Sequence, residues 1–229
     1  MELVVNFSGG KDSSAMLAYI VENYNRYPIH VVFADTGWEH DDAIRWSESI
    51  VGRFGLPLHV VRNPNKDFFQ MVRSRGKFPS PAQRQCTSDL KRNPIQTWIR
   101  RSCTSGVIVN CMGLRAEESA ARAKRLTLTR DRAMTNSKRT VWNWLPIHGW
   151  SEIQVRSYLA ERDIPLHPVY DYLNRFSCQV CIYMSKHDLT AVQTNNPTAF
   201  NRIAELEREI GFTMQPGYTL AEKINTRNS

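Results

Sequence analysis

The chain has 229 residues, 41% hydrophobic and 23% charged, which suits one ordinary globular domain and excludes a largely disordered polymer. Its formal net charge of +8 suits an anionic partner, from a nucleotide to a nucleic acid, although a generally basic surface without a polymer partner fits the same charge. No apolar run approaches the ~20 residues of a membrane-spanning helix and the N-terminus lacks a signal-peptide pattern, so we expect a soluble cytoplasmic protein with no membrane partner.

Short apolar runs alternate with helical patterns along most of the chain. The runs that predict buried strands cover residues 3–7, 29–34, 58–61 and 106–111, with a further candidate at 140–147. Apolar residues at helical spacing predict helices over 15–21, 41–54 and about 86–101, whereas 62–84 shows no regular pattern. This alternation predicts a doubly wound α/β fold with a mainly parallel sheet.

Two later helices carry capping signals at their starts. Ser151 is followed three residues on by Gln154, which is the pattern of a capping box. Asn196 precedes a proline, as an N-cap does before a proline at the first helical position, and this helix is expected to end at Gly211. We expect residues 1–165 to form the α/β domain and 166–229 to form a helical extension packed on it.

A glycine-containing loop lies between the first strand and the first helix, with the sequence Ser8-Gly9-Gly10-Lys11-Asp12-Ser13-Ser14. The adjacent glycines let the backbone approach a phosphate without a Cβ in the way, and the helix start offers unpaired N–H groups. Lys11 adds positive charge and the two serines add hydroxyl donors. Asp12 is placed to position either a magnesium ion or the loop itself.

The spacing of this loop differs from the usual P-loop, in which four residues separate the glycines. It resembles instead the pyrophosphate loop (PP-loop) of the N-type ATP pyrophosphatases and their relatives in sulfur metabolism. The resemblance implies that residues 8–14 bind the phosphates of an adenine nucleotide. From the residues alone, a glycine-rich turn before a polar helix start is the alternative.

Two further segments agree with this resemblance. Asp35-Thr36-Gly37-Trp38 is similar to the Asp-Thr-Gly-Trp of the small subunit of sulfate adenylyltransferase and of phosphoadenylylsulfate (PAPS) reductases. It follows a predicted strand, where ligands bind in open α/β sheets, although such a segment by itself is often only a turn. Gly113-Leu114-Arg115-Ala116-Glu117-Glu118 resembles the Gly-x-Arg-x-x-Glu element of the same family. The resemblance implies that Asp35, Thr36, Gly113 and Arg115 contact the nucleotide, with the planar donor fork of Arg115 on phosphate oxygens.

Three of the five cysteines form a pattern of their own. Cys178 and Cys181 are spaced as Cys-x-x-Cys, and Cys86 lies far upstream. By spacing alone they are a redox pair, half of a zinc site, part of an iron–sulfur site or simply free thiols. Cys111 falls in a predicted strand and is expected to be a small buried apolar residue.

The surroundings of Cys86 resemble the Cys-(Cys/Thr)-x-x-x-Lys-x-x-Pro segment of adenylylsulfate (APS) and PAPS reductases. In cluster-bearing APS reductases, adjacent cysteines there join a later Cys-x-x-Cys to hold a 4Fe–4S cluster. This chain has Thr87 at the second position. The resemblance therefore implies a cluster on Cys86, Cys178 and Cys181 with one open iron, and Cys103 is a candidate for a fourth ligand.

Together the motifs, from Ser8 to Cys181, resemble the PAPS reductase superfamily and its adenine nucleotide alpha-hydrolase-like fold. Two departures matter. The Glu-Cys-Gly motif of thioredoxin-linked reductases has no counterpart, since no cysteine follows Cys181, and the Lys-Asp-Ser-Ser portion of the loop matches enzymes that cleave ATP between its α- and β-phosphates. Both departures favour ATP over APS or PAPS as the substrate.

The function that this resemblance implies is adenylylation of an acceptor by ATP, followed by sulfur transfer. Lys11 and Arg115 would stabilise charge on the phosphates, Asp12 would assist Mg²⁺, and the cluster would hold or deliver sulfur. The expected partners are a nucleic acid acceptor on the basic stretch 115–139 and a sulfur-donor or reductant protein. Two alternatives stay open: a sulfonucleotide reductase that uses a partner's thiol, and a non-catalytic nucleotide-binding subunit.

Overall fold

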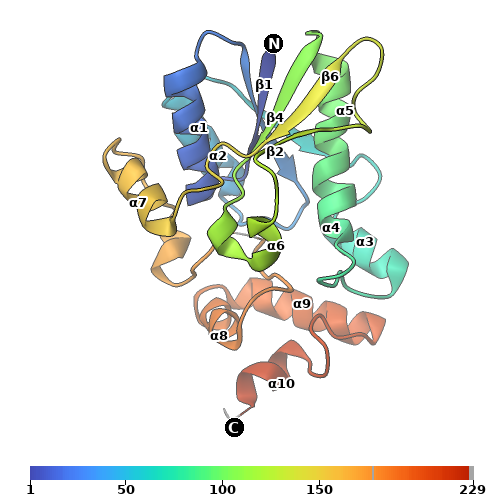
Figure 1. Cartoon of the computed structure of the whole chain (residues 1–229). Coiled ribbons are helices and arrows are strands. Elements are labelled where there is room, and N and C mark those ends of the chain that lie inside the picture. The colour runs from blue at the N-terminus through green and yellow to red at the C-terminus, as the bar shows by residue number, and fades with distance from the viewer. Residues whose placement is uncertain (177, 227–229) are drawn as a thin grey trace. The chain divides into compact units, whose positions relative to one another are not determined.

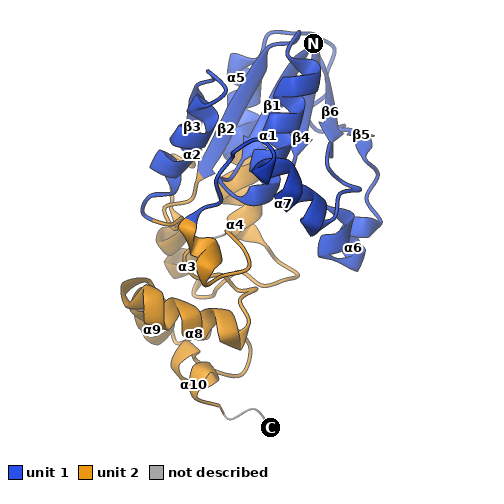
Figure 2. Cartoon of the chain, turned by 90° about the vertical axis from the view of Figure 1, so that its left-hand side faces the viewer, with its two compact units in different colours: residues 1–34, 41–61, 94–167 blue, residues 35–40, 62–93, 168–229 orange. Residues whose placement is uncertain are grey.

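The computed structural model describes residues 1–176 and 178–226, and its chain divides into two compact units (Figure 2). Unit 1 comprises residues 1–34, 41–61 and 94–167, and unit 2 comprises 35–40, 62–93 and 168–229. Each unit is thus assembled from three stretches of the chain. The expected division between 1–165 and 166–229 stays a prediction.

Among the described residues, six strands form one sheet in the order β3-β2-β1-β4-β6-β5 (Figure 2). The strands are β1 (Glu2–Phe7), β2 (Ile29–Asp35), β3 (Leu58–Arg62), β4 (Val107–Met112), β5 (Leu128–Arg130) and β6 (Thr140–Trp144). β1 pairs in parallel with β2 and β4, and β4 pairs in parallel with β6, whereas β5 runs antiparallel to β6. The prediction of a mainly parallel sheet is confirmed.

Helices cover both faces of this sheet (Figure 1) because the side chains of its strands alternate between two apolar clusters. Leu3 and Val5 of β1 pack in one cluster with residues of α1, α2 and α7, whereas Val4 packs in another with residues of α5. The bounds are α1 Lys11–Tyr24, α2 Ala43–Gly52, α5 Asn93–Ser102 and α7 Glu152–Ala160, with the short α6 at Ala120–Ala123 and a 3-10 turn at Ala116–Glu118. This arrangement confirms the doubly wound α/β class.

Strand β1 lies at the point where the strand order reverses. The chain runs from β1 outward through β2 and β3, and then returns to the other side of β1 to form β4. Ligands of open α/β sheets bind beyond the carboxyl ends of the strands at such a switch point. The loops that follow β1 and β4 therefore occupy the position where a nucleotide is expected.

Unit 2 is mainly helical and has its own apolar cluster, with Trp38, Met71 and Leu90 fully buried in it. Its helices are α3 (Phe68–Arg75), α4 (Gln85–Thr87), α8 (Lys186–Asn195), α9 (Pro197–Ile210) and α10 (Leu220–Asn225), with a π-helical turn at Ser88–Arg92 and a 3-10 turn at Pro168–Asp171. The helix predicted near 86–101 is thus a continuous stretch formed by α4, the π-helical turn and α5. The predicted cap at Asn196 is confirmed, since its side chain accepts from Ala199 N at 3.1 Å.

The stretch 62–84, which was expected to be less regular, contains a helix that the sequence analysis did not predict, α3 at residues 68–75. Asp67 Oδ1 accepts from Gln70 N at 2.7 Å, and Gln70 Oε1 accepts from Asp67 N at 2.9 Å, so the helix begins with a full capping box. Only two turns follow before Gly76 takes the left-handed conformation that ends the helix. So short a helix shows little apolar periodicity, and the Asp-x-x-Gln pair was the signal that could have found it.

Within the described part of the chain, none of the helices combines the length and the apolar character that crossing a membrane requires.

Candidate functional site

The loop after β1 has a backbone that only glycine adopts easily. Gly9 has a φ of +78°, and Gly10 is the extended N-cap of α1 with no side chain to cap it. Ser13 Oγ donates to Gly10 O at 2.9 Å and accepts from Ser8 N at 3.3 Å, so the loop is closed by its own hydroxyl. From α2, Trp46 Nε1 donates to Gly9 O at 3.0 Å and fixes the loop from outside. The first amides of α1 are thereby presented to an anion.

Gly113, one residue beyond β4, packs directly against the backbone of the first turn of α1. A Cβ at this position would lie 3.2 Å from the carbonyl oxygen of Asp12 and 3.3 Å from the amide nitrogen of Ser13. The segment after β4 therefore approaches the PP-loop as closely as backbone allows. The sequence placed Gly113 in the site by resemblance, and the structure supplies this steric reason for a glycine.

Arg115 joins the two loops through charge. Its side chain is 4% exposed, and its Nε donates to Asp12 Oδ1 at 2.6 Å while its Nη1 donates to Glu117 Oε2 at 2.5 Å. Burial alone would lower the pKa of Arg115, but the carboxylates of Asp12 and Glu117 outweigh it and raise the pKa. The guanidinium therefore stays protonated and binds the carboxylates of Asp12 and Glu117. In this way it holds Asp12 in place.

Lys11 lies in the same charged cluster. Its ammonium is 3.6 Å from Asp12 Oδ2 and 3.8 Å from Glu152 Oε1, and its side chain is only 5% exposed. Glu152 N also donates to Glu117 Oε2 at 2.6 Å, which ties the start of α7 to this cluster. Glu152 was missed from the sequence because nothing local marks the first residue of a distant helix as a neighbour of Lys11. The charged cluster at the start of α1 therefore contains two cations, Lys11 and Arg115, and three carboxylates, those of Asp12, Glu117 and Glu152.

Asp35 and Thr36 belong to unit 2, where they shape a tight turn. Asp35 Oδ1 accepts from Gly37 N at 2.8 Å, and Asp35 Oδ2 pairs with Arg62 at 2.5 Å. Thr36 donates from both its N and its Oγ1 to Glu39 Oε2, each at 2.8 Å. The predicted nucleotide contacts of Asp35 and Thr36 stay predictions.

The same turn holds the Cys-x-x-Cys loop. Trp38 is fully buried, its Nε1 donates to Val180 O at 3.0 Å, and its carbonyl accepts from Gln179 N at 3.1 Å. The side chain of Gln179 donates to Glu39 O at 2.8 Å. Two segments about 140 residues apart in the chain are therefore joined by backbone and side-chain bonds. The sequence singled out both segments but contained no sign that they meet.

Cys86, Cys178 and Cys181 come together in unit 2, where each is partly buried against the apolar cluster. Burial raises the pKa of the Cys86 and Cys178 thiols, and the charges of the cysteines raise it further. Lys91 lies beside them, with its ammonium 3.1 Å from Glu39 Oε1. Burial would lower the pKa of Lys91, but the charges of Cys178 and Glu39 outweigh it and raise the pKa. The site therefore contains three sulfur donors beside the ammonium group of Lys91, which stays protonated.

This donor set fits an iron–sulfur cluster, which cysteine thiolates hold. Cys103 lies in unit 1, in hydrogen-bonding contact with Glu2, and Cys111 is fully buried in β4 as predicted.

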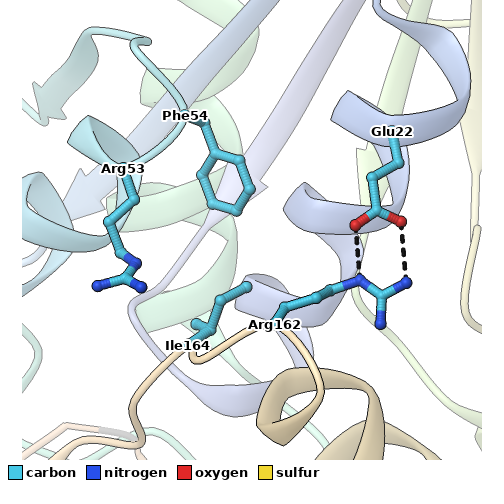
Figure 3. A pocket seen from close by; sticks show the side chains of 5 residues that line it. All are labelled: Glu22, Arg53, Phe54, Arg162 and Ile164. Atoms are coloured by element: carbon cyan, nitrogen blue, oxygen red, sulfur yellow. Dashed lines mark hydrogen bonds and ion pairs between the residues drawn. The ribbon is translucent and has the colours of Figure 1, made fainter.

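A hollow in unit 1 lies away from these residues. Figure 3 shows its lining, which consists of Glu22, Arg53, Phe54, Arg162 and Ile164. Its charged groups have hydrogen-bond partners, since Arg162 Nε donates to Glu22 Oε1 at 2.6 Å and Arg53 donates to the backbone carbonyl of Asp163 at 2.8 Å. Glu22 is also roughly 16 Å along α1 from Lys11, at 1.5 Å per residue. The hollow is therefore separate from the PP-loop.

Comparison with known proteins places most of the chain in one family. A model of the phosphoadenosine phosphosulfate reductase domain matches residues 2–184. An uncharacterised protein of Methanocaldococcus jannaschii is 28% identical over 208 residues, which cover 90% of this chain and 42% of the relative. A phosphoadenosine 5'-phosphosulfate reductase of Aliivibrio fischeri is 27% identical over 72% of this chain, and a sulfate adenylyltransferase subunit 2 of Mycolicibacterium gilvum is 28% identical over 73%. The chain spans 61% and 57% of the lengths of these last two relatives.

Solved structures share the fold at low identity. A PAPS reductase from Candida auris, in a phosphate complex, superimposes with a TM-score of 0.50 at 15% identity, covering 74% of this chain and 76% of its own. A U34-tRNA thiolase from Methanococcus maripaludis, solved with its 4Fe–4S cluster, gives a TM-score of 0.54 at 14% identity, covering 100% of this chain and 82% of its own. These likenesses confirm the α/β fold.

Proposed function

This chain belongs to the phosphoadenosine phosphosulfate reductase domain family, as its motifs predicted, and we propose that unit 1 binds the phosphates of an adenine nucleotide at residues 8–14. The observation that carries the proposal is the loop itself. Gly9 turns the backbone at a positive φ, Gly10 leaves the start of α1 without a side-chain cap, and both lie at the switch point of the sheet. A helix start built in this way favours an anion.

The nucleotide we propose is ATP, and the reaction is adenylylation of an acceptor. An acceptor oxygen attacks the α-phosphorus, the bond from that phosphorus to the bridging oxygen breaks, and pyrophosphate leaves with the bonding pair. Lys11 and the amides of α1 stabilise the charge that builds up on the phosphates. The carboxylate of Asp12 offers the oxygen ligand that Mg²⁺ prefers, so Asp12 would hold the ion that accompanies the nucleotide. Arg115 is a positioning residue in this scheme, since it acts through Asp12.

We assign sulfur handling to the cysteines of unit 2. Cys86, Cys178 and Cys181 would hold a 4Fe–4S cluster, whose chemistry is to bind a sulfur atom at the iron that has no protein thiolate. Lys91 offsets the negative charge of the thiolates and so favours their ionised form. Inorganic sulfide is the sulfur source. Its sulfur bonds to the acceptor carbon, and the adenylylated oxygen leaves that carbon as AMP.

The acceptor we propose is a nucleic acid. In unit 1 an exposed basic group follows the Arg115 segment, and it consists of Lys124, Arg125, Arg130, Arg132 and Lys138. Together with the net charge of +8, this group suits a phosphate backbone. The tRNA thiolase that shares the fold acts on such an acceptor, according to its name. Binding of a tRNA mixture should weaken steeply as salt is raised, and binding that ignores ionic strength would count against this acceptor.

Product analysis tests the reaction. The holoprotein is incubated with ATP, sulfide and a tRNA mixture, and pyrophosphate is measured; in parallel it is given PAPS with a dithiol reductant, and sulfite is measured. Pyrophosphate release that is lost in Lys11→Ala and kept in Lys77→Ala supports the proposal, since Lys77 is an exposed lysine of unit 2. Sulfite without pyrophosphate would overturn it.

The second candidate is a sulfonucleotide reductase that takes its nucleophilic thiol from a partner, and the family match and the 27% identity to a PAPS reductase favour it. Sulfite formation that depends on an added thiol protein is its signature. A third outcome, tight ATP binding with no turnover until another chain is added, would indicate a nucleotide-binding subunit, as the sulfate adenylyltransferase relative suggests.

Iron analysis tests the cysteine site separately. Protein purified without oxygen is expected to contain iron and sulfide in equal amounts, and Cys86→Ser should lose most of both. Cys111→Ser is the matched control, because Cys111 is a fully buried cysteine of the other unit. Colourless protein that is free of iron and sulfide yet active would rule out the cluster.

A further inference from the structure

A second group of metal-binding side chains lies at the other end of the strands from the PP-loop. Glu2 begins β1, His30 is the second residue of β2, and Cys103 directly follows α5. One ligand atom from each lies within 4.8 Å of the other two. All three belong to unit 1, and the proposed reaction uses none of them.

The carboxylate of Glu2 is held in a fixed orientation. Its Oε1 accepts from Thr104 N at 3.0 Å and from Ser105 N at 2.6 Å, which leaves Oε2 facing His30 Nε2 at 2.9 Å. Glu2 is 8% exposed and Cys103 is 3% exposed, so two of the three donors are withdrawn from water. Such outer hydrogen bonds orient metal ligands in known sites. The group is therefore ordered before any ion binds.

We propose that Glu2, His30 and Cys103 bind a zinc ion. A thiolate, an imidazole and a carboxylate are the three donor types that zinc takes in proteins. Bonds of about 2.0–2.3 Å in tetrahedral geometry place the donor atoms roughly 3.3–3.8 Å apart. The Glu2–His30 pair would open by a few tenths of an ångström, which side-chain rotation provides. A water molecule completes the coordination.

This ion would lie away from the proposed nucleotide site. Ligands of open α/β sheets bind beyond the carboxyl ends of the strands, whereas Glu2 and His30 stand at the amino ends of β1 and β2. An ion here ties two central strands to the segment that leaves α5. It therefore stabilises unit 1 against unfolding, because only the folded chain brings the three ligands together.

The test must remove the cysteines of unit 2, because the proposed function also assigns metal binding to them. We would use the full chain with Cys86, Cys178 and Cys181 replaced by serine, stripped of metal by a chelator, and titrate it with Zn²⁺ and, for its thiolate charge-transfer band, with Co²⁺. One equivalent of zinc, a thiolate–cobalt band and a raised melting temperature are expected. In that background, Cys103→Ser and His30→Gln should each weaken zinc binding at least tenfold, whereas Cys111→Ser should not.

Absence of zinc binding at micromolar concentrations in the folded background chain would overturn the proposal, as would equal affinity in the Cys103→Ser and Cys111→Ser variants. Circular dichroism establishes that each variant is folded. If the serine background does not fold, bound zinc is counted in otherwise natural chains. His30→Gln should then hold one equivalent less than Cys111→Ser, and equal counts would refute the site.

Discussion

The close approach of Gly113 to the start of α1 allows a sharp test of the nucleotide site. In Gly113→Ala the new Cβ would lie 3.2 Å from Asp12 O, 3.3 Å from Asp12 C and 3.3 Å from Ser13 N. All three atoms belong to the backbone of the first helical turn, so no flexible side-chain end can move aside. We expect the PP-loop to shift by a few tenths of an ångström.

The expected cost follows from the size of this overlap. Overpacking by one methyl group costs about 1–3 kcal/mol, and the modest overlap here suggests about 1–2 kcal/mol. Replacing glycine by alanine also removes about 0.4–1 kcal/mol of unfolded-state entropy where the backbone permits it. Gly149→Ala is the matched control, because Gly149 lies in the same unit and a Cβ there meets nothing within 4 Å. The difference between the two variants therefore isolates the contact.

The assay is a thermal melt of both variants together with ATP titration by calorimetry. At about 2–4 °C per kcal/mol for a chain of this size, Gly113→Ala should melt roughly 2–8 °C below Gly149→Ala. It should also bind ATP at least several-fold more weakly, because its loop has moved. Equal melting temperatures and equal affinities would refute the reasoning that the segment after β4 sets the shape of the PP-loop.

Three more substitutions test the contacts of both units. Arg115→Lys keeps the positive charge but loses the planar guanidinium that binds Asp12 and Glu117 together. We therefore expect the affinity for ATP to fall and the free energy of unfolding to decrease by about 1–2 kcal/mol. An unchanged affinity would exclude the positioning role. Trp38→Phe leaves the Val180 carbonyl without its donor at a cost of about 1–3 kcal/mol, and the purified variant should hold less iron than the natural chain does. Glu39 has its pKa held below the ordinary 4.5 because Lys91 and Thr36 outweigh its burial, so its stabilising contribution is present above pH 4.5 and is lost as the pH falls through the lowered pKa. Urea melts should therefore show the largest stability gap between the natural chain and Glu39→Gln near neutral pH, with the gap closing below pH 4.5; a gap that does not depend on pH would contradict this account.

The PP-loop illustrates how far local pattern reaches. Adjacent glycines after an apolar run predicted a strand, a phosphate-shaped turn and a helix start, and the structure has β1, the positive φ of Gly9 and α1 in that order. The capping box at Ser151 was equally predictable, because Ser151 and Gln154 are only three positions apart. Resemblance to a family linked Arg115 to the loop, and it linked Cys86 to the later Cys-x-x-Cys pair. No local rule would have made either link.

Local pattern predicted five of the six described strands, though not the short β5, together with several helices and the loop, because hydrophobic spacing and capping act over a few residues. Tertiary structure alone decided that Arg115 binds Asp12, 103 positions away, and that Trp38 holds the backbone of the Cys-x-x-Cys loop. It also decided that Glu2, His30 and Cys103 meet. Such contacts depend on strand order and register, as where Val5 of β1 pairs with Cys111 of β4, and on the packing of distant segments. The spacing of residues along the chain predicts neither the strand register nor this packing.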